Sequence, residues 1–119
     1  MINPDQTKEE RIRQELKKLN SIFAKMDIKT KRAIKSLMEN AAFMAVTLAD
    51  LQMQINENGV TSDYQNGENQ FGTKKSPEVE IYTSMIEKYM KAIKQLTDLL
   101  PKQEIAPKDD GFDKFVNNR

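Results

Sequence analysis

Apolar residues recur along the first hundred positions at alternating steps of three and four, which is the spacing of an amphipathic helix. This pattern predicts helices over about residues 6–25, 28–57 and 77–100. In the longest of them the apolar stripe runs through Ile34, Leu37, Ala41, Met44, Leu48, Leu51 and Ile55. The chain is therefore predicted to be all-α, with three main helices in each protomer.

Capping residues and helix breakers support these boundaries. Asp27 suits the start of the second helix, Ser76 is expected to cap the third, and Pro101 stops it. An Asn-Gly pair suits the end of the second helix. Residues 1–101 are therefore expected to form a single helical domain, followed by a flexible polar tail over 102–119.

The polar loop over 58–76 is long, since a helix–helix connection in a compact bundle usually takes about 2–8 residues. Asn66-Gly67 is a typical hairpin turn, but its flanks are polar, so both a small hairpin and an irregular loop remain open. The extra length carries two aromatic residues, Tyr64 and Phe71. We expect them to cap the end of the helix bundle or to reach a neighbouring subunit.

The middle of the second helix is apolar nearly all round, which indicates burial on several sides, in the core or at a subunit interface. An apolar share of 38% also fits amphipathic helices that complete their burial against partner chains. We therefore expect a homo-oligomer, and a head-to-tail ring would use different faces of each protomer. The predicted interface residues are Phe43, Met44, Leu48, Leu51, Tyr64 and Phe71.

Charge is unevenly distributed, although the net charge is only +1. Residues 1–35 hold ten Lys/Arg and five acids, whereas residues 36–73 hold no Lys or Arg. Basic residues at a helix start oppose the macrodipole, which indicates that local helix stability did not dictate them. Contact with DNA phosphates is the functional reading, whereas for this cluster alone an ordinary solvated face is the more common one, and both stay open. Lys25 adds to the charge of the first helix. The predicted DNA-binding residues are Arg11, Lys17, Lys18, Lys29, Lys31, Arg32 and Lys35, joined by Lys74 and Lys75 from the loop.

The residue types present exclude several classes of chemistry. The chain has no Cys and no His, which excludes disulfides, thiol or His catalysis and the usual zinc sites. The stretch "GENQFG" lacks the Lys-Ser/Thr pair of a phosphate-binding loop. We therefore expect no catalytic residue, no metal, no cofactor and no enzymatic activity. Neither a signal peptide nor an apolar run of about 20 residues is visible, so a soluble intracellular protein is expected.

Three segments resemble the small terminase subunits of tailed phages of Gram-positive hosts and their prophages. They are "NAAFM", "INENGV" and "YTSMIEKYMKAIKQLTDLLPK", and the resemblance covers about residues 10–102. It implies a ring that recognises double-stranded viral DNA at the packaging start, in the host bacterial cytoplasm. It also implies recruitment and regulation of the large subunit, which holds the ATPase and nuclease. Many family members carry a helix-turn-helix, but the helix predicted over 28–57 is too long for a recognition helix.

The tail suggests how partners would be engaged. Phe112, Phe115 and Val116 lie at helical spacing in a mostly polar segment, so we expect them to dock on the large subunit or on the portal. The main alternative is a helical oligomeric scaffold or regulator that does not bind DNA. The near-neutral net charge and the middle segment without Lys or Arg support that alternative, and DNA binding at moderate salt separates the two.

Overall fold

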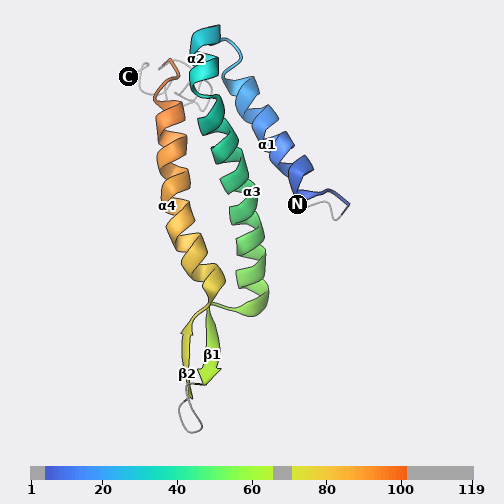
Figure 1. The fold of residues 1–119 in the computed structure, drawn as a ribbon, viewed down its shortest axis with the longest axis vertical. Coiled ribbons are helices and arrows are strands. Elements are labelled where there is room, and N and C mark those ends of the chain that lie inside the picture. Colours follow the sequence, from blue (N-terminus) through green and yellow to red (C-terminus); the bar gives the residue numbers. More distant parts are fainter. Residues whose placement is uncertain (1–4, 66–70, 102–119) are drawn as a thin grey trace, which may run out of the picture.

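A computed structural model describes residues 5–65 and 71–101 (Figure 1). The elements are α1 (Lys8–Ile22), α2 (Ile28–Ala33), α3 (Lys35–Asn58), β1 (Thr61–Gln65), β2 (Phe71–Lys75) and α4 (Pro77–Thr97). The helices α3 and α4 lie side by side and antiparallel, and the hairpin β1–β2 projects beyond them at one end. The prediction of a mostly helical chain is confirmed, with this two-stranded hairpin as an addition.

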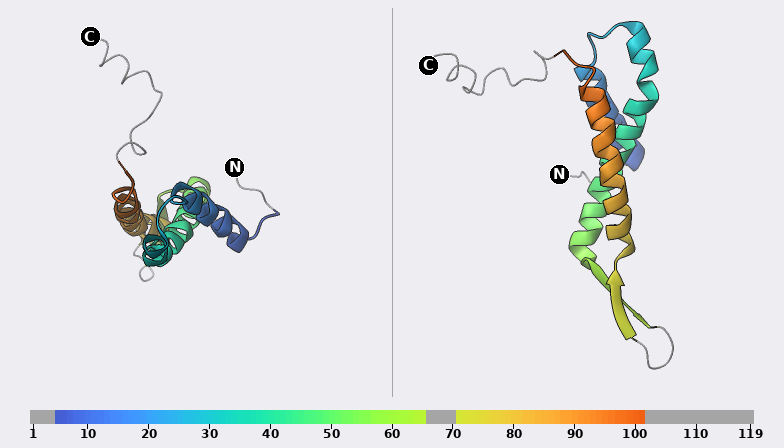
Figure 2. Two further views of the ribbon diagram at one scale, coloured as in Figure 1. Left: turned by 90° about the horizontal axis from the view of Figure 1, so that it is seen from above. Right: turned by 90° about the vertical axis from the view of Figure 1, so that its left-hand side faces the viewer.

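The helix α3 is the central element of the protomer. Seen from above, α3 and α2 lie between α4 on one side and α1 on the other (Figure 2). The molecule is elongated, with extents of 68 × 40 × 27 Å. Two faces of α3 are therefore covered by helices of the same chain, which explains why its middle is apolar over so wide an arc.

The helix α1 begins where the sequence provides a cap. The Thr7 hydroxyl oxygen accepts a hydrogen bond from the Glu10 N–H at 3.1 Å, and Glu9 and Glu10 lie in the positive first turn. The helix ends at Ile22, three residues before the predicted boundary, and a turn follows. Phe23 in that turn is 2% exposed, so the chain leaves α1 to bury this side chain.

The prediction of one continuous helix over 28–57 is wrong, because the chain breaks at Ile34 into α2 and α3. Ile34 has φ −98° and ψ 3°, outside the helical values. No Pro or Gly lies there, so local sequence gives no reason for the break. Ile34 is 7% exposed and packs in the core cluster with Phe23, so tertiary packing is the physical cause.

The core lies toward the α2 end of the molecule and is shared by all three long helices. Its buried members are Phe23, Ile34, Met38, Ala41, Ala92 and Leu96. Leu16 and Leu19 of α1 and Leu100 after α4 pack against it. The C-terminal end of α4 is therefore fixed beside α2 and the start of α3.

The loop over 58–76 folds as a hairpin, which resolves the two alternatives left by its sequence. Thr61 pairs with Lys75 and Gln65 with Phe71 in an antiparallel register. Gly59 ends α3 with φ 84°, in the left-handed region that favours glycine. The length of this segment is thus used to build two strands, and the turn between them lies outside the described residues.

Ser76 occupies the predicted N-cap position of α4, but its side chain has a different role from capping the helix. It makes no side-chain capping hydrogen bond to α4, and its hydroxyl instead donates to the Gly59 carbonyl oxygen at 3.2 Å. The Ser76 N–H donates to the Val60 carbonyl oxygen at 3.0 Å. Ser76 is 2% exposed, so these bonds close the base of the hairpin where it meets the helices.

Candidate nucleic-acid interface and subunit contacts

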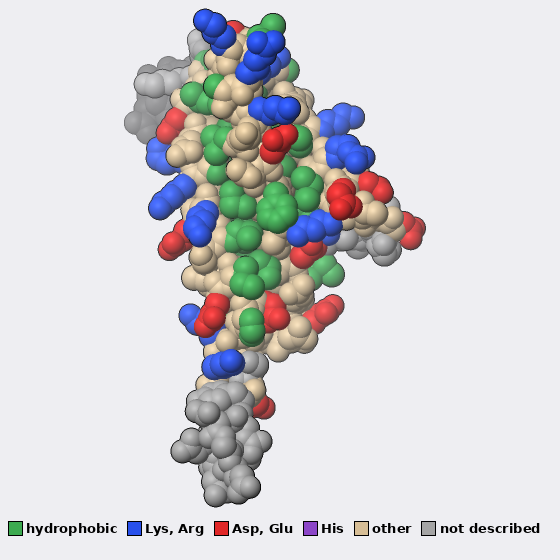
Figure 3. All heavy atoms as spheres, in the orientation of Figure 1, with side chains coloured by type: hydrophobic (Ala, Val, Ile, Leu, Met, Phe, Trp, Pro, Cys, Tyr) green, Lys and Arg blue, Asp and Glu red, His purple; other side chains and the backbone are tan. Residues whose placement is uncertain are grey.

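One end of the molecule is strongly basic. Between Leu16 and Met38 the chain carries seven Lys/Arg and a single acid, Asp27. The folding of α1, α2 and the start of α3 toward one end gathers these side chains around α2 (Figure 3). We call this surface the basic end, and it consists of Lys17, Lys18, Lys25, Lys29, Lys31, Arg32 and Lys35.

Asp27, the acid in this stretch, stabilises the local fold as the N-cap of α2. One carboxylate oxygen of Asp27 accepts from the Thr30 N–H at 3.3 Å, and the other accepts from the Thr30 hydroxyl. These hydrogen bonds, chiefly the one from the hydroxyl, lower the pKa of Asp27 below its usual value. The carboxylate is therefore needed as the cap of α2 and forms no ion pair with the surrounding lysines within the described residues.

Most cations of the basic end have no acidic partner. Lys18 Nζ lies 3.2 Å from Glu15 Oε1, in an exposed pair on α1. Within residues 5–65 and 71–101, the other six form no ion pair. Unpaired surface cations at this density are suited to the phosphates of a nucleic-acid backbone, which exchange condensed counterions for Lys and Arg.

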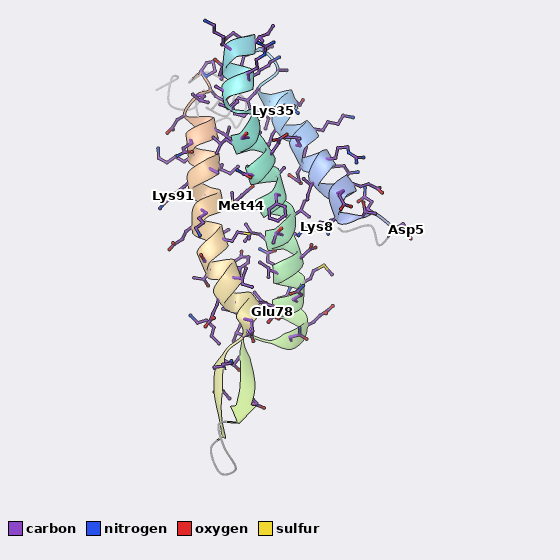
Figure 4. All side chains as sticks on the ribbon, viewed as in Figure 1. Asp5, Lys8, Lys35, Met44, Glu78 and Lys91 are labelled. Carbon is purple, nitrogen blue, oxygen red and sulfur yellow. The ribbon has the colours of Figure 1, made fainter. Side chains whose placement is uncertain are left out.

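Part of the basic end is hollowed. A cavity of about 270 Å³ has an apolar floor and a basic rim, and we call it the basic hollow. It is lined by Leu16, Ile28 and Met38, by Lys31, Arg32 and Lys35, and by Asn20 and Glu39. Figure 4 labels Lys35 where α2, α3 and the end of α1 meet. Three of the predicted DNA-binding residues therefore share one concave site.

Sequence reasoning left Lys25 out of the predicted DNA-binding set. It lies exposed in the turn between α1 and α2, between Lys18 and Lys29 along the chain. The excess of positive charge over residues 1–35 is the sequence signal that points to Lys25 as well. It belongs to the basic end on position and charge.

Arg11 has a structural role that the sequence did not reveal. Its guanidinium lies 2.7 Å from Asp50 Oδ1, and the two side chains are 14% and 30% exposed. The pair joins α1 to α3 away from the basic end. The structure thus gives Arg11 a partner within the protomer, and its contact with DNA stays a prediction.

Replacing Arg11 by Ala is expected to destabilise the protomer by about 1–3 kcal/mol, because Asp50 then keeps a partly buried charge without its partner. Urea unfolding followed by circular dichroism measures this change. Lys18→Ala is the matched control, since its exposed pair with Glu15 contributes at most about 1 kcal/mol. Equal stability of the Arg11 and Lys18 variants would contradict the structural role.

The two loop lysines do not join the basic end of the same protomer. Lys74 and Lys75 are exposed on β2, at the opposite end of the long axis. In β1 and β2 the backbone of Tyr64 pairs with Gly72, and that of Phe71 pairs with Gln65, but their side chains lie outside what the structure describes. The tail residues Phe112, Phe115 and Val116 also lie outside the described residues.

The predicted interface residues divide into core and surface. Leu48 and Leu51 are 5% and 7% exposed within one protomer, so they belong to its own interior and are not free for a neighbour. Phe43 is 45% exposed, and the Lys8 ammonium lies 4.7 Å from its ring centroid. Met44 is half-buried between α3 and α4, where Figure 4 labels it. Only Phe43 and Met44 of these four present apolar surface outward.

Met44 opens onto an apolar groove between α3 and α4, with a volume of about 370 Å³. Ile81 and Met85 of α4 form the rest of its apolar surface, and Ile81 is 50% exposed. Figure 3 shows hydrophobic side chains gathered along this seam. We call it the front groove. Sequence reasoning placed Ile81 and Met85 on the apolar face of α4 but did not assign them to an interface.

A second apolar hollow lies on another side of the same helix pair and has a volume of about 430 Å³. Val60, Val79 and Tyr82 contribute to it, and Gln52 Nε2 donates to the Tyr82 hydroxyl at 2.9 Å. Val79 and Ile81 are two residues apart, so they project about 200° apart around α4. This second hollow therefore faces a different direction from the front groove.

The described residues form no metal site and no membrane-spanning helix. Residues 5–65 and 71–101 contain no group of His, Cys, Asp and Glu that could hold a metal ion. In the same part of the chain no helix combines the length and the apolar character that a bilayer crossing needs. No protein-family model, curated protein or solved structure matches the chain. Its function is therefore argued from its own residues and their arrangement.

Proposed function

We propose that this chain is the small subunit of a phage DNA-packaging terminase, from a tailed phage or prophage of a Gram-positive host. In this role it is a non-catalytic oligomer that binds double-stranded viral DNA at the packaging start. It recruits and regulates the large ATPase-nuclease subunit in the host bacterial cytoplasm. The observation that carries the proposal is the basic end, with six cations free of ion pairs within the described residues. The family resemblance of the sequence supplies the biological setting.

The chemistry of the basic end favours contact with the DNA backbone. Lys and Arg side chains neutralise phosphates in any sequence, and each contact makes binding more dependent on salt. The six-residue α2 presents Lys29, Lys31 and Arg32 and is much shorter than a typical recognition helix. Repetition of this surface around an oligomer would let several protomers contact the same DNA.

Two apolar surfaces on different sides of the α3–α4 pair support a head-to-tail homo-oligomer. Contiguous exposed apolar surface marks interaction sites in soluble proteins. A heterologous contact joins unlike faces, and it closes into a ring when the rotation between subunits permits. In this proposal the front groove of one protomer packs against the second hollow of the next, with Phe43, Met44 and Ile81 on one side and Tyr82 on the other.

The proposal assigns the tail to partner recruitment. Phe112, Phe115 and Val116 would dock on the large subunit, with the portal as a further candidate. No catalytic residue, metal or cofactor is assigned to this chain, because the large subunit performs the chemistry. Deleting residues 103–119 should therefore reduce binding of the large subunit in a pull-down with purified components.

Native mass spectrometry of the purified chain, with and without double-stranded DNA, tests the proposed function directly. We expect a closed homo-oligomer that binds DNA at moderate salt. A strictly monomeric chain would contradict the terminase assignment. An oligomer without affinity for DNA would instead support the alternative of a helical scaffold or regulator, which the exposed apolar surfaces also fit.

A further inference from the structure

The basic hollow has a composition that phosphate binding alone does not explain. Its rim carries Lys31, Arg32 and Lys35, but its floor is apolar, and Ile28 at its edge is 65% exposed. A DNA backbone gains little from an apolar floor. An acidic peptide with apolar side chains would use both the floor and the rim, since burial of the apolar groups would accompany the ionic contacts.

The tail of the same chain contains a segment with that chemistry. Residues 109–116 read "DDGFDKFV", with three acids, one Lys and three large apolar side chains. Phe112 has an acid on its C-terminal side and two acids three and two positions before it. The segment is thus complementary in charge and polarity to the basic hollow. Glu39 also lines the hollow, but three cations outnumber this one acid, so the lining has a net positive charge.

The tail is long enough to reach the hollow of its own protomer. The described chain ends at Pro101, and Leu100 packs against the core cluster that contains Met38. Met38 is also part of the floor of the hollow. The tail therefore starts at the same end of the molecule, and the seven residues 102–108 span up to about 25 Å when extended.

We propose that residues 109–116 dock in the basic hollow of the same chain and compete there with DNA. Phe112 packs on the apolar floor, and Asp109, Asp110 and Asp113 pair with the basic rim. The docking itself is independent of the proposed function, whereas the competition with DNA rests on it. The acidic tail would thereby make DNA binding weaker in the resting protein and stronger once a partner removes the tail.

Tryptophan fluorescence tests the docking without any DNA. The chain has no Trp, so Phe112→Trp introduces a single indole into the tail. We expect blue-shifted emission and protection from acrylamide at low salt, because the indole is buried on the floor of the hollow. Emission typical of water under these conditions would overturn the proposal. The emission should not change on dilution, and a shift toward the exposed form would overturn docking within one chain.

Charge reversal identifies the hollow as the site. Lys31→Glu, Arg32→Glu and Lys35→Glu together should expose the indole, and adding Asp109→Lys, Asp110→Lys and Asp113→Lys should bury it again. A far-ultraviolet circular dichroism melt confirms that each variant is folded, since the rim residues lie at the surface. Protection that survives the rim reversal would place the tail elsewhere and overturn the proposal.

The competition has its own readout. If the tail occupies the hollow in nine of ten molecules, deleting residues 103–119 strengthens DNA binding about tenfold. A gel-shift titration of the full chain and the truncated chain measures this ratio. Protected tryptophan with no gain in affinity on truncation would overturn the competition. Absence of DNA binding in both chains, with protected tryptophan, would contradict the proposed function and leave the docking supported.

Discussion

Replacing Lys31, Arg32 and Lys35 together by Ala is expected to weaken DNA binding by about two to three orders of magnitude near 0.1 M salt. The three side chains share the rim of the basic hollow and have no acidic partner in the described residues. Each lost phosphate contact lowers the salt slope for duplex DNA by about 0.9, so the slope should fall by about three for each protomer in contact. Gel-shift titrations across a salt series measure both quantities.

The matched control removes the same charge elsewhere. Arg13, Lys91 and Lys94 are exposed on α1 and α4 and line neither the basic hollow nor the front groove, and Figure 4 labels Lys91. Their joint replacement by Ala lowers the net charge equally but should leave the salt slope nearly unchanged. Similar losses in both variants would show that affinity follows net charge, and would contradict a localised DNA site. Thermal melts of both variants should match the parent, since no core side chain is altered.

The spacing of apolar residues predicted α1, α3 and α4, because each of these helices packs one face against the core and its apolar residues therefore recur every three to four positions. It missed the break at Ile34, where the cause is burial beside Phe23 and Leu96 and not a local breaker. The sequence also did not decide between a hairpin and an irregular loop over residues 58–76. The pair Asn66-Gly67 is a hairpin signal in the sequence, but the polar segments on either side of it show no alternation to support strands.

The candidate site was predictable in outline, because charge distribution along the chain is a property of sequence. The role of an individual basic residue was not predictable in this way. The ion pair of Arg11 with Asp50, for example, depends on the packing of α1 against α3. Likewise Leu48 and Leu51 read as interface residues on a helix that is apolar nearly all round. Only the packing of α1 and α4 against α3 separates side chains that serve the core from those, such as Phe43, that remain outside.

Replacing Ile81 by Glu is expected to dissociate the oligomer into folded monomers at micromolar concentration. Ile81 is 50% exposed and lies in the front groove with Met44 and Met85, so the protomer tolerates a polar side chain there. In the proposed assembly the new carboxylate would be buried at every subunit contact, in a groove that Glu80 and Lys88 also line. Such burial costs about 3–5 kcal/mol, and the cost is repeated around a ring.

Native mass spectrometry and light scattering measure the assembly, and circular dichroism checks the helices. Gln95→Glu is the matched control, because Gln95 is exposed on α4 and lines neither the front groove nor the second hollow. It adds the same charge to the same helix and should leave the oligomer intact. An unchanged assembly in the Ile81 variant would exclude the front groove as a subunit contact. Loss of assembly with retained DNA affinity per protomer would show that the groove and the basic end act separately, as their positions on different parts of the protomer predict.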